Sequence, residues 1–242
     1  MAGGSADPPR GRPARVVFLG TPEFAVPVLH ALVASPLVAV TLVVTQPDRP
    51  AGRGRHLTPP PVKAAAMAHG LDVYQPERLR GAAALERLAA AAADLFVIAA
   101  YGQILRPAVL ALPPRGCLNV HPSLLPRHRG PAPVAAAILA GDRETGVTIM
   151  LTDAGMDTGP ILAQRRLPLT GRETTASLTP VLFDLGAALL IETIPAWLDG
   201  ALASRPQGES RATVSRLFAR EDGRVDWRRP AVEIARQIRA LN

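Results

Sequence analysis

Short apolar runs rich in β-branched residues alternate with segments of helical periodicity along most of this chain, and this alternation constrains its fold most strongly. The runs predict strands at residues 15–19, 37–44, 71–74, 95–99, 117–121, 146–151 and 161–167. The other segments predict helices at residues 23–35, 61–69, 81–93, 132–140, 176–202 (one long helix or a kinked pair) and 231–242. Such alternation is typical of an α/β protein with a doubly wound, mostly parallel sheet. In these sheets ligands bind beyond the carboxyl ends of the strands, at a switch point in strand order.

One stretch, residues 45–61, interrupts the alternation. It contains five prolines and two glycines together with Arg49, Arg53 and Arg55, and it has no hydrophobic periodicity. We therefore expect a long loop on the ligand edge of the sheet. Its charge alone does not distinguish a solvated connection from a contact surface for nucleic acid.

The composition bounds the class of protein. With 242 residues, of which 48% are hydrophobic, the chain can bury a sizeable core, and its formal net charge is +7. The single cysteine, Cys117, excludes an internal disulfide and fits a reducing compartment. Residues 1–14 lack the apolar region of a secretory signal, and we expect them to be a disordered extension. Because the apolar runs are too short to span a bilayer, we expect a cytoplasmic protein that does not enter a membrane. We also expect a monomer.

The most informative polar residues are Asn119 and His121, which lie two positions apart near the end of a predicted strand. Alternate residues of a strand point to the same face, so the carboxamide and the imidazole are expected side by side. Together they can hold a developing oxyanion, and the imidazole can also relay a proton. The alternative is that both are buried polar groups that bond to the backbone.

A carboxylate is the natural third member of such a site, because it orients the imidazole and favours its charged form. Asp153 and Asp157 both lie in the glycine-containing loop that follows the strand at residues 146–151. Either could instead begin a turn, and the residues alone leave the choice open.

The histidine spacing argues against a metal site. None of the remaining histidines, His30, His56, His69 and His128, forms a paired-ligand spacing with a carboxylate. We therefore expect no metal cofactor.

Five segments closely resemble methionyl-tRNA formyltransferases, and the resemblance extends from Arg15 to the end of the chain. They are Leu-Gly-Thr-Pro-Glu-Phe at residues 19–24, Thr-Gln-Pro-Asp-Arg-Pro-Ala-Gly-Arg-Gly at 45–54, Ala-Tyr-Gly-Gln-Ile-Leu at 100–105, the run 119–130 and the run 146–159. The Asn-x-His, Ser-Leu-Leu-Pro and Asp-x-Gly motifs are shared with folate-dependent formyltransferases that act on a purine ribonucleotide or an aminosugar nucleotide. Residues 45–54 are therefore the segment that favours a tRNA substrate.

The resemblance assigns roles to particular residues. It implies a catalytic trio of Asn119, His121 and Asp157, and so selects Asp157 over Asp153. The residues it places at the folate are Tyr101, Ile104, Ser123, Leu124, Leu125 and Pro126. Those it places at the tRNA are Arg49, Arg53, Arg55 and Lys63.

The resemblance also implies the organisation of the chain. Residues 15–203 would form a catalytic domain with a Rossmann-like formyltransferase fold. Residues 204–242 would be a C-terminal extension and linker toward a tRNA-binding barrel domain, of ordinary domain size, that this chain does not contain.

The activity implied is transfer of a formyl group from 10-formyltetrahydrofolate, as co-substrate, to the amino group of methionine on initiator methionyl-tRNA. Asn119 and His121 would hold the oxyanion, and Asp157 would assist proton movement. The alternative is a folate-dependent formyltransferase that acts on a small amine. A folate- or tRNA-binding protein without catalysis is disfavoured because the trio is intact.

Overall fold

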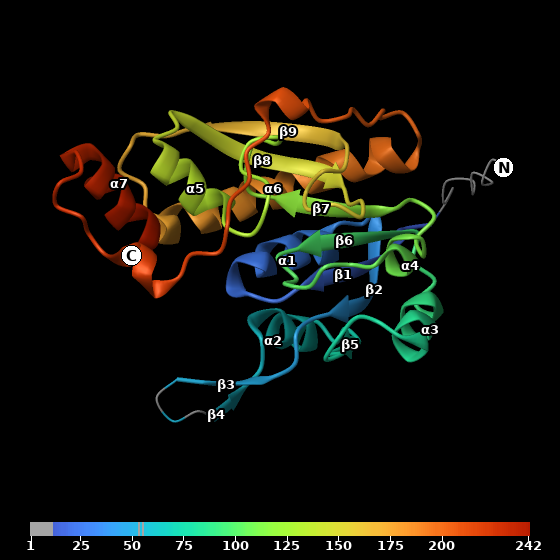
Figure 1. Ribbon diagram of the computed structural model, residues 1–242. Coiled ribbons are helices and arrows are strands. Elements are labelled where there is room, and N and C mark those ends of the chain that lie inside the picture. Colours follow the sequence, from blue (N-terminus) through green and yellow to red (C-terminus); the bar gives the residue numbers. More distant parts are fainter. Residues whose placement is uncertain (1–11, 53, 55) are drawn as a thin grey trace.

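The alternating strands form one seven-stranded sheet with the order β5-β2-β1-β6-β7-β8-β9 (Figure 1). The computed structural model describes residues 12–52, 54 and 56–242, so most of the expected N-terminal extension and both Arg53 and Arg55 lie outside the described residues. The strands are β1 (Ala14–Gly20), β2 (Val38–Val44), β5 (Val73–Tyr74), β6 (Leu95–Ala99), β7 (Cys117–His121), β8 (Glu144–Leu151) and β9 (Ile161–Pro168). The helices are η1 (Glu23–Ala25), α1 (Val26–Ala34), α2 (Pro61–Ala68), α3 (Ala82–Ala90), α4 (Pro107–Leu110), α5 (Pro133–Ala140), α6 (Thr175–Leu198), η2 (Glu209–Arg211), η3 (Arg220–Gly223) and α7 (Ala231–Leu241).

The sheet is doubly wound and mostly parallel, which confirms the expected fold class. Strands β1, β2, β5, β6 and β7 pair in parallel, whereas β8 is antiparallel to both β7 and β9. The chain winds from β1 outward to β5 and then returns to place β6 on the other side of β1. The switch point therefore lies between the carboxyl ends of β1 and β6, where an open sheet of this kind binds its ligand.

Helices cover both faces of the sheet because the parallel strands are apolar on both faces. One core cluster joins the sheet to α1, α2 and α6, and a second joins the opposite face to α3 and α4. The long segment near residue 180 is a single helix, α6, that contains Pro180 and Pro195. By length and composition α6 could cross a membrane, but half of its apolar window is buried in the protein. Its buried side chains belong to the first core cluster and to a smaller cluster shared with α5 and α7.

The stretch 45–61 was expected to be a long loop with no helix or strand over most of its length, and the structure adds one short element to this expectation. It contains a short antiparallel hairpin of β3 (Arg49–Ala51) and β4 (His56–Thr58), which projects away from the sheet (Figure 1). The strands are three residues each and include a proline, so the sequence shows no alternation long enough to predict them. Backbone pairing and the turn, rather than a buried face, define this hairpin.

The segment that follows α6 lies against the sheet. Residues 205–215, which we call the C-terminal strap, form bridges from Arg205 to Ile161 on β9 and from Val214 to Arg129. Figure 1 shows the strap, coloured orange to red, crossing in front of β8 and β9 and leading to α7, which packs beside α5. The strap thus connects the last strand of the sheet to the loop that follows β7.

Helix α6 crosses β7 and β8 closely because Gly186 has no side chain. A Cβ atom at Gly186 would lie 2.5 Å from Val120 Cγ1 and 3.0 Å from Val147 Cγ2. Both valines are buried in the core and have little room to move.

We therefore expect Gly186→Val to lower the free energy of unfolding by about 1–3 kcal/mol, since extra volume in a packed core forces side chains and backbone apart. Ala188→Val is the matched control, because Ala188 is exposed on the same helix. Denaturant unfolding of both variants measures the difference. Equal stability of the two variants would contradict the close packing of α6 on the sheet.

Candidate functional site

Strand β7 brings Asn119 and His121 to the same face at its carboxyl end. Asn119 pairs in register with Ile98 on β6 and Met150 on β8, and His121 pairs with Thr148. His121 is only 4% exposed, whereas Asn119 is half-buried. The otherwise apolar strand β7 thus positions these two polar side chains next to the switch point.

Asp157 lies beside both Asn119 and His121. Asn119 Nδ2 donates to Asp157 Oδ1 at 3.3 Å, and His121 Nδ1 lies 3.7 Å from Oδ2. The backbone N–H of Gly130 donates to the same Oδ2 at 2.8 Å. The carboxylate therefore lies where it meets both β7 side chains and the loop that follows β7.

Asp153 has a different position. Its Oδ1 accepts hydrogen bonds from the backbone N–H of Gly155 at 3.0 Å and from Thr158 Oγ1 at 2.8 Å. Asp153 therefore forms an Asx turn, which fixes the shape of the loop. Gly159 then brings the loop back against β8, since a Cβ atom there would lie 1.8 Å from the carbonyl oxygen of Leu151. The structure thus brings Asp157, and not Asp153, to Asn119 and His121.

The hydrogen bonds of His121 indicate its tautomer. Its Nε2 lies 3.0 Å from the carbonyl oxygen of His128, which can only accept, so Nε2 carries the proton. Nδ1 then faces Asp157. A second proton on Nδ1 would make the ring a cation beside a carboxylate, which suits both proton relay and the stabilisation of an oxyanion.

The Ser-Leu-Leu-Pro residues form a turn packed on β8. Ser123 is fully buried and its hydroxyl donates to the carbonyl of Arg127 at 2.7 Å. Leu125 is buried beside Met150 and Ile161, while Leu124 and Pro126 are half-buried. The backbone N–H of Leu125 donates to Thr148 Oγ1 at 3.1 Å. These bonds therefore fix the shape of the turn.

Tyr101 and Ile104 lie in the loop after β6 but in different surroundings. Tyr101 is 2% exposed, and burial raises the pKa of its phenol to about 12. Ile104 is 85% exposed, and Met156, beside Asp157, is also exposed. Two loops with exposed apolar side chains thus follow the two strands that neighbour β7.

A hollow of about 560 Å³ opens at the switch point. Its lining residues are Thr21, Pro22, Gln46, Pro47, Arg49, Thr58, Pro59, Pro60, Pro61, Ala100, Tyr101 and Gly102. Thr21 Oγ1 and Gln46 Nε2 both donate to the carbonyl of Tyr101, at 3.0 and 3.2 Å. These bonds connect the ends of β1, β2 and β6 at the base of the β3–β4 hairpin.

The cations assigned to tRNA are not equivalent. Arg49 is exposed on β3 and lines the hollow at the switch point. Lys63 Nζ lies 2.7 Å from Asp48 Oδ2, and Gln75 Nε2 donates to Asp48 Oδ1 at 2.7 Å. Hydrogen bonds from Gln75 and then Lys63 hold the pKa of Asp48 below its usual value. Lys63 therefore fixes the base of the hairpin.

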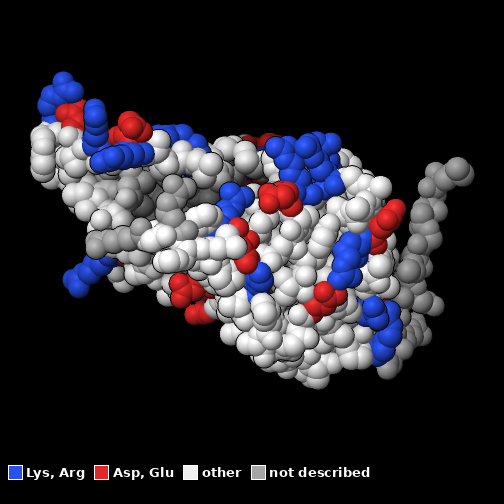
Figure 2. Space-filling model, turned by 90° about the horizontal axis from the view of Figure 1, so that it is seen from below, with Lys and Arg blue, Asp and Glu red and all other residues white. Residues whose placement is uncertain are grey.

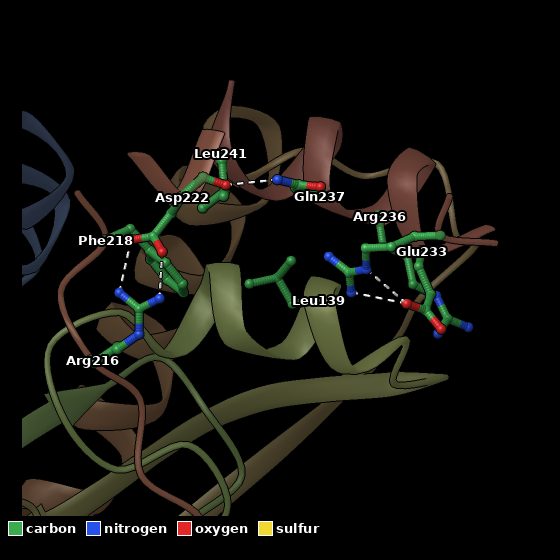
Figure 3. Close-up of a pocket in the computed structure, with 9 residues that line it drawn as sticks. Leu139, Arg216, Phe218, Asp222, Glu233, Arg236, Gln237 and Leu241 are labelled. Atoms are coloured by element: carbon green, nitrogen blue, oxygen red, sulfur yellow. Dashed lines mark hydrogen bonds and ion pairs between the residues drawn. The ribbon is translucent and has the colours of Figure 1, made fainter. Parts of the chain in front are cut away.

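A second hollow, of about 400 Å³, lies between α5 and the C-terminal helix α7 (Figure 3). Arg216 and Arg229 on its wall pair with Asp222 and Glu233, and none of the trio lines it. This hollow is therefore separate from the candidate site. Among the described residues, no group of three or more His, Cys, Asp or Glu side chains is arranged to hold a metal ion.

Three contributors to the site had no signal in the sequence. The N–H of Gly130 and the carbonyl of His128 are backbone groups, which residue types do not reveal. Gln207 belongs to the polar C-terminal strap, yet its Nε2 donates to the carbonyl of Asp157 at 2.8 Å. Only the contact across 50 residues identifies it.

Comparisons with known proteins identify the family of this chain. Residues 14–194 match the sequence profile of the formyl transferase family. The methionyl-tRNA formyltransferase of Chloroflexus aggregans is 58% identical over 228 residues, covering 94% of this chain and 74% of the relative. That of Roseiflexus sp. (strain RS-1) is 57% identical over 230 residues, covering 95% of this chain and 71% of the relative.

Solved structures share the fold. Glycinamide ribonucleotide transformylase 1 from Symbiobacterium toebii has a TM-score of 0.66 at 25% identity, over 82% of this chain and 96% of that one. A sugar N-formyltransferase from Shewanella sp. has a TM-score of 0.72 at 17% identity, over 94% of this chain and 88% of that one. The sequence relatives and the matched profile show that this chain belongs to the methionyl-tRNA formyltransferase family of formyl transferases.

Proposed function

We propose that this chain transfers a formyl group from 10-formyltetrahydrofolate to the amino group of methionine on initiator methionyl-tRNA. The observation that carries the proposal is the meeting of Asn119, His121 and Asp157 at the carboxyl end of β7, in a chain 58% identical to a relative of that name. The setting is the cytoplasm, which the buried free thiol of Cys117 fits, and the working unit is a monomer.

The trio supports acyl transfer between two bound substrates. The neutral amine attacks the formyl carbon on N10, and the carbonyl oxygen becomes an oxyanion. Asn119 Nδ2 has a second hydrogen free to donate to it, since only one is directed to Asp157. The tetrahedral intermediate then collapses with cleavage of the bond between carbon and N10. One proton leaves the amine and one reaches N10, so no net proton is released.

His121 and Asp157 are suited to move that proton. Because Nε2–H bonds to the His128 carbonyl, Nδ1 is the ring nitrogen that exchanges a proton with the reacting groups. Asp157 Oδ2 at 3.7 Å stabilises the charged ring, although this distance exceeds a direct hydrogen bond and would tighten when substrates bind.

The loops on either side of the trio fit a flat, partly apolar co-substrate. Ile104 and Met156 offer exposed apolar surface, and the turn from Ser123 to Pro126 offers a fixed shape. A solved relative, the N-formyltransferase from Helicobacter canadensis, contains folinic acid. We assign the folate to these residues and the methionyl end of the tRNA to the side of the hollow at the switch point.

The β3–β4 hairpin supports the tRNA as the amine substrate. On the face that Figure 2 shows, the described Lys and Arg residues form separate groups beside Asp and Glu and not a continuous basic surface. The projecting hairpin, with Arg49 at the edge of the hollow, instead offers a small contact area for the acceptor end of the tRNA. Arg53 and Arg55 lie on the same segment of the sequence.

Replacing Asn119 or His121 with Ala is expected to lower kcat by about 100- to 1000-fold, the usual loss for an oxyanion donor. Asp157→Asn should cause a comparable loss. Asp153→Asn is the matched control, since an amide oxygen can still accept from Gly155 and Thr158. Formylation of charged initiator tRNA at saturating folate measures all four. Equal losses at Asp153 and Asp157 would exclude the assigned trio.

Arg49→Ala and Arg53→Ala are expected to raise KM for methionyl-tRNA and leave folate affinity unchanged. Each lost phosphate contact to single-stranded RNA should reduce the slope of log affinity against log salt by about 0.7. Arg166→Ala is the control, because Arg166 on β9 pairs with Glu144 on β8, near the edge of the sheet opposite to the hairpin. A changed folate affinity with an unchanged salt slope would show that the hairpin contacts the folate and not the tRNA.

The small-amine alternative makes the opposite prediction. If a purine ribonucleotide or an aminosugar nucleotide were the substrate, formylation would proceed without tRNA and would tolerate substitutions in residues 45–61. We expect kcat/KM for these amines to be lower than for methionyl-tRNA by a factor of about 1000 or more, because a small amine leaves the groups that bind the tRNA without partners. Competition between methionyl-tRNA and each amine for labelled formyl donor measures this ratio, and a ratio near one would overturn the tRNA assignment.

A further inference from the structure

The C-terminal strap reaches the backbone of the proposed catalytic loop through Gln207. Its Nε2 donates to two carbonyl oxygens, those of Asp157 and Gly159, both at 2.8 Å. Its Oε1 accepts from Arg129 Nε at 3.0 Å. One half-buried amide therefore connects the strap, the loop after β8 and the loop after β7.

Arg129 is itself held firmly. It is 5% exposed, and its two terminal nitrogens donate to the two carboxylate oxygens of Glu209 at 3.0 and 2.7 Å. The hydrogen bonds with Glu209 raise the pKa of Arg129, so its charge persists. A buried guanidinium with a bidentate partner has a fixed plane, which fixes the direction of Nε–H toward Gln207.

These contacts close a ring around Asp157. Gln207 holds the backbone carbonyl of Asp157, and the N–H of Gly130, the residue after Arg129, holds its carboxylate at 2.8 Å. Asp157 has a φ of 54°, a left-handed conformation that is unfavourable for most residues other than glycine. An external tie is needed to keep a non-glycine residue in this conformation in one orientation.

The strap also fixes the residues next to His121. Thr213 accepts the backbone N–H of Arg129 at 2.9 Å, and its Oγ1 accepts the N–H of His128 at 2.8 Å. The carbonyl of His128 is the group that accepts from His121 Nε2. Both partners of the imidazole therefore depend on residues 205–215.

We propose that Gln207, held by Arg129 and Glu209, is a positioning residue that aims the Asp157 carboxylate at His121 and Asn119. The proposal rests on the proposed role of Asp157 in formyl transfer. It extends the functional site beyond residue 194, where the match to the formyl transferase family ends. Gln207 touches no reacting atom and acts through Asp157.

The first test is kinetic. Gln207→Leu has a similar volume but cannot donate to the two carbonyls. It should lower kcat by about 10- to 100-fold, the order of loss for a displaced catalytic group, with KM for both substrates within about twofold. Glu192→Gln is the control, since it weakens an exposed pair with Arg165 away from the trio.

A double-variant cycle separates positioning from general stability. If Gln207 acts through Asp157, adding Gln207→Leu to Asp157→Asn should reduce kcat no further. Losses that multiply in the double variant would overturn the proposal. If Gln207→Leu does not fold, Glu209→Gln replaces it in the same double-variant cycle, because it changes a side chain that is 74% exposed. We expect Glu209→Gln to lower kcat several-fold.

The second test needs no substrate. The ¹⁵N chemical shifts of the His121 ring in the free protein report its tautomer and hydrogen bonds. Gln207→Leu and Asp157→Asn should move them in the same direction, and Glu192→Gln should not. Unchanged His121 shifts in Gln207→Leu would overturn the positioning role. A wild-type protein that does not formylate methionyl-tRNA would instead refute the proposed function, while the shifts would still decide the positioning.

Discussion

The carboxylate of Asp157 is the point on which the rest of the site depends, because three separate parts of the chain meet there. It accepts from Asn119 on β7 and from the N–H of Gly130 in the next loop, and it faces His121 Nδ1. The bond from Gly130 is short, at 2.8 Å, whereas the contacts with Asn119 and His121 are longer, at 3.3 and 3.7 Å. Their common geometry follows from the sheet, since the antiparallel pairing of β7 and β8 returns the chain to β7 and lets the loop 152–160 cross over it. The chemistry therefore depends on backbone placement more than on any single side-chain bond.

The order of the strands explains why the two substrates can approach each other. The hollow at the switch point opens over β1, β2 and β6, whereas Asn119 and His121 lie on the next strand, β7. A donor bound beside β7 and an amine that enters from the hollow would meet above Asn119. The bonds of Thr21 and Gln46 to the Tyr101 carbonyl hold the loop between these two regions, so its position is set by the polar ends of strands whose interiors are apolar.

Residue patterns predicted the parts of this molecule that are repeated or buried. Strand β7 was predicted at its observed bounds because residues 117–121 form a mostly apolar run, and the same property located β6. The pattern missed α4, which has four residues, and the β3–β4 hairpin, whose strands show no alternation. The residues alone left Asp153 and Asp157 equivalent, since both lie in one loop. The turn made by Asp153 separates them, as do the left-handed backbone of Asp157 and its contacts with Asn119 and His121. None of these properties is visible in residue type.

Long-range polar contacts mark the limit of such prediction, and Gln207 shows why they are also functional. The loop 152–160 directs the Asp157 carboxylate toward β7, which leaves the carbonyls of Asp157 and Gly159 for another partner. The C-terminal strap, which follows β9 and α6 in the chain, covers these carbonyls. A glutamine amide supplies two donors from one nitrogen. An apolar side chain at that position would leave two carbonyls without their donor, and an acidic one would repel them. The completed site therefore includes residues far along the chain, which bind the backbone of a loop that local sequence forms only in part.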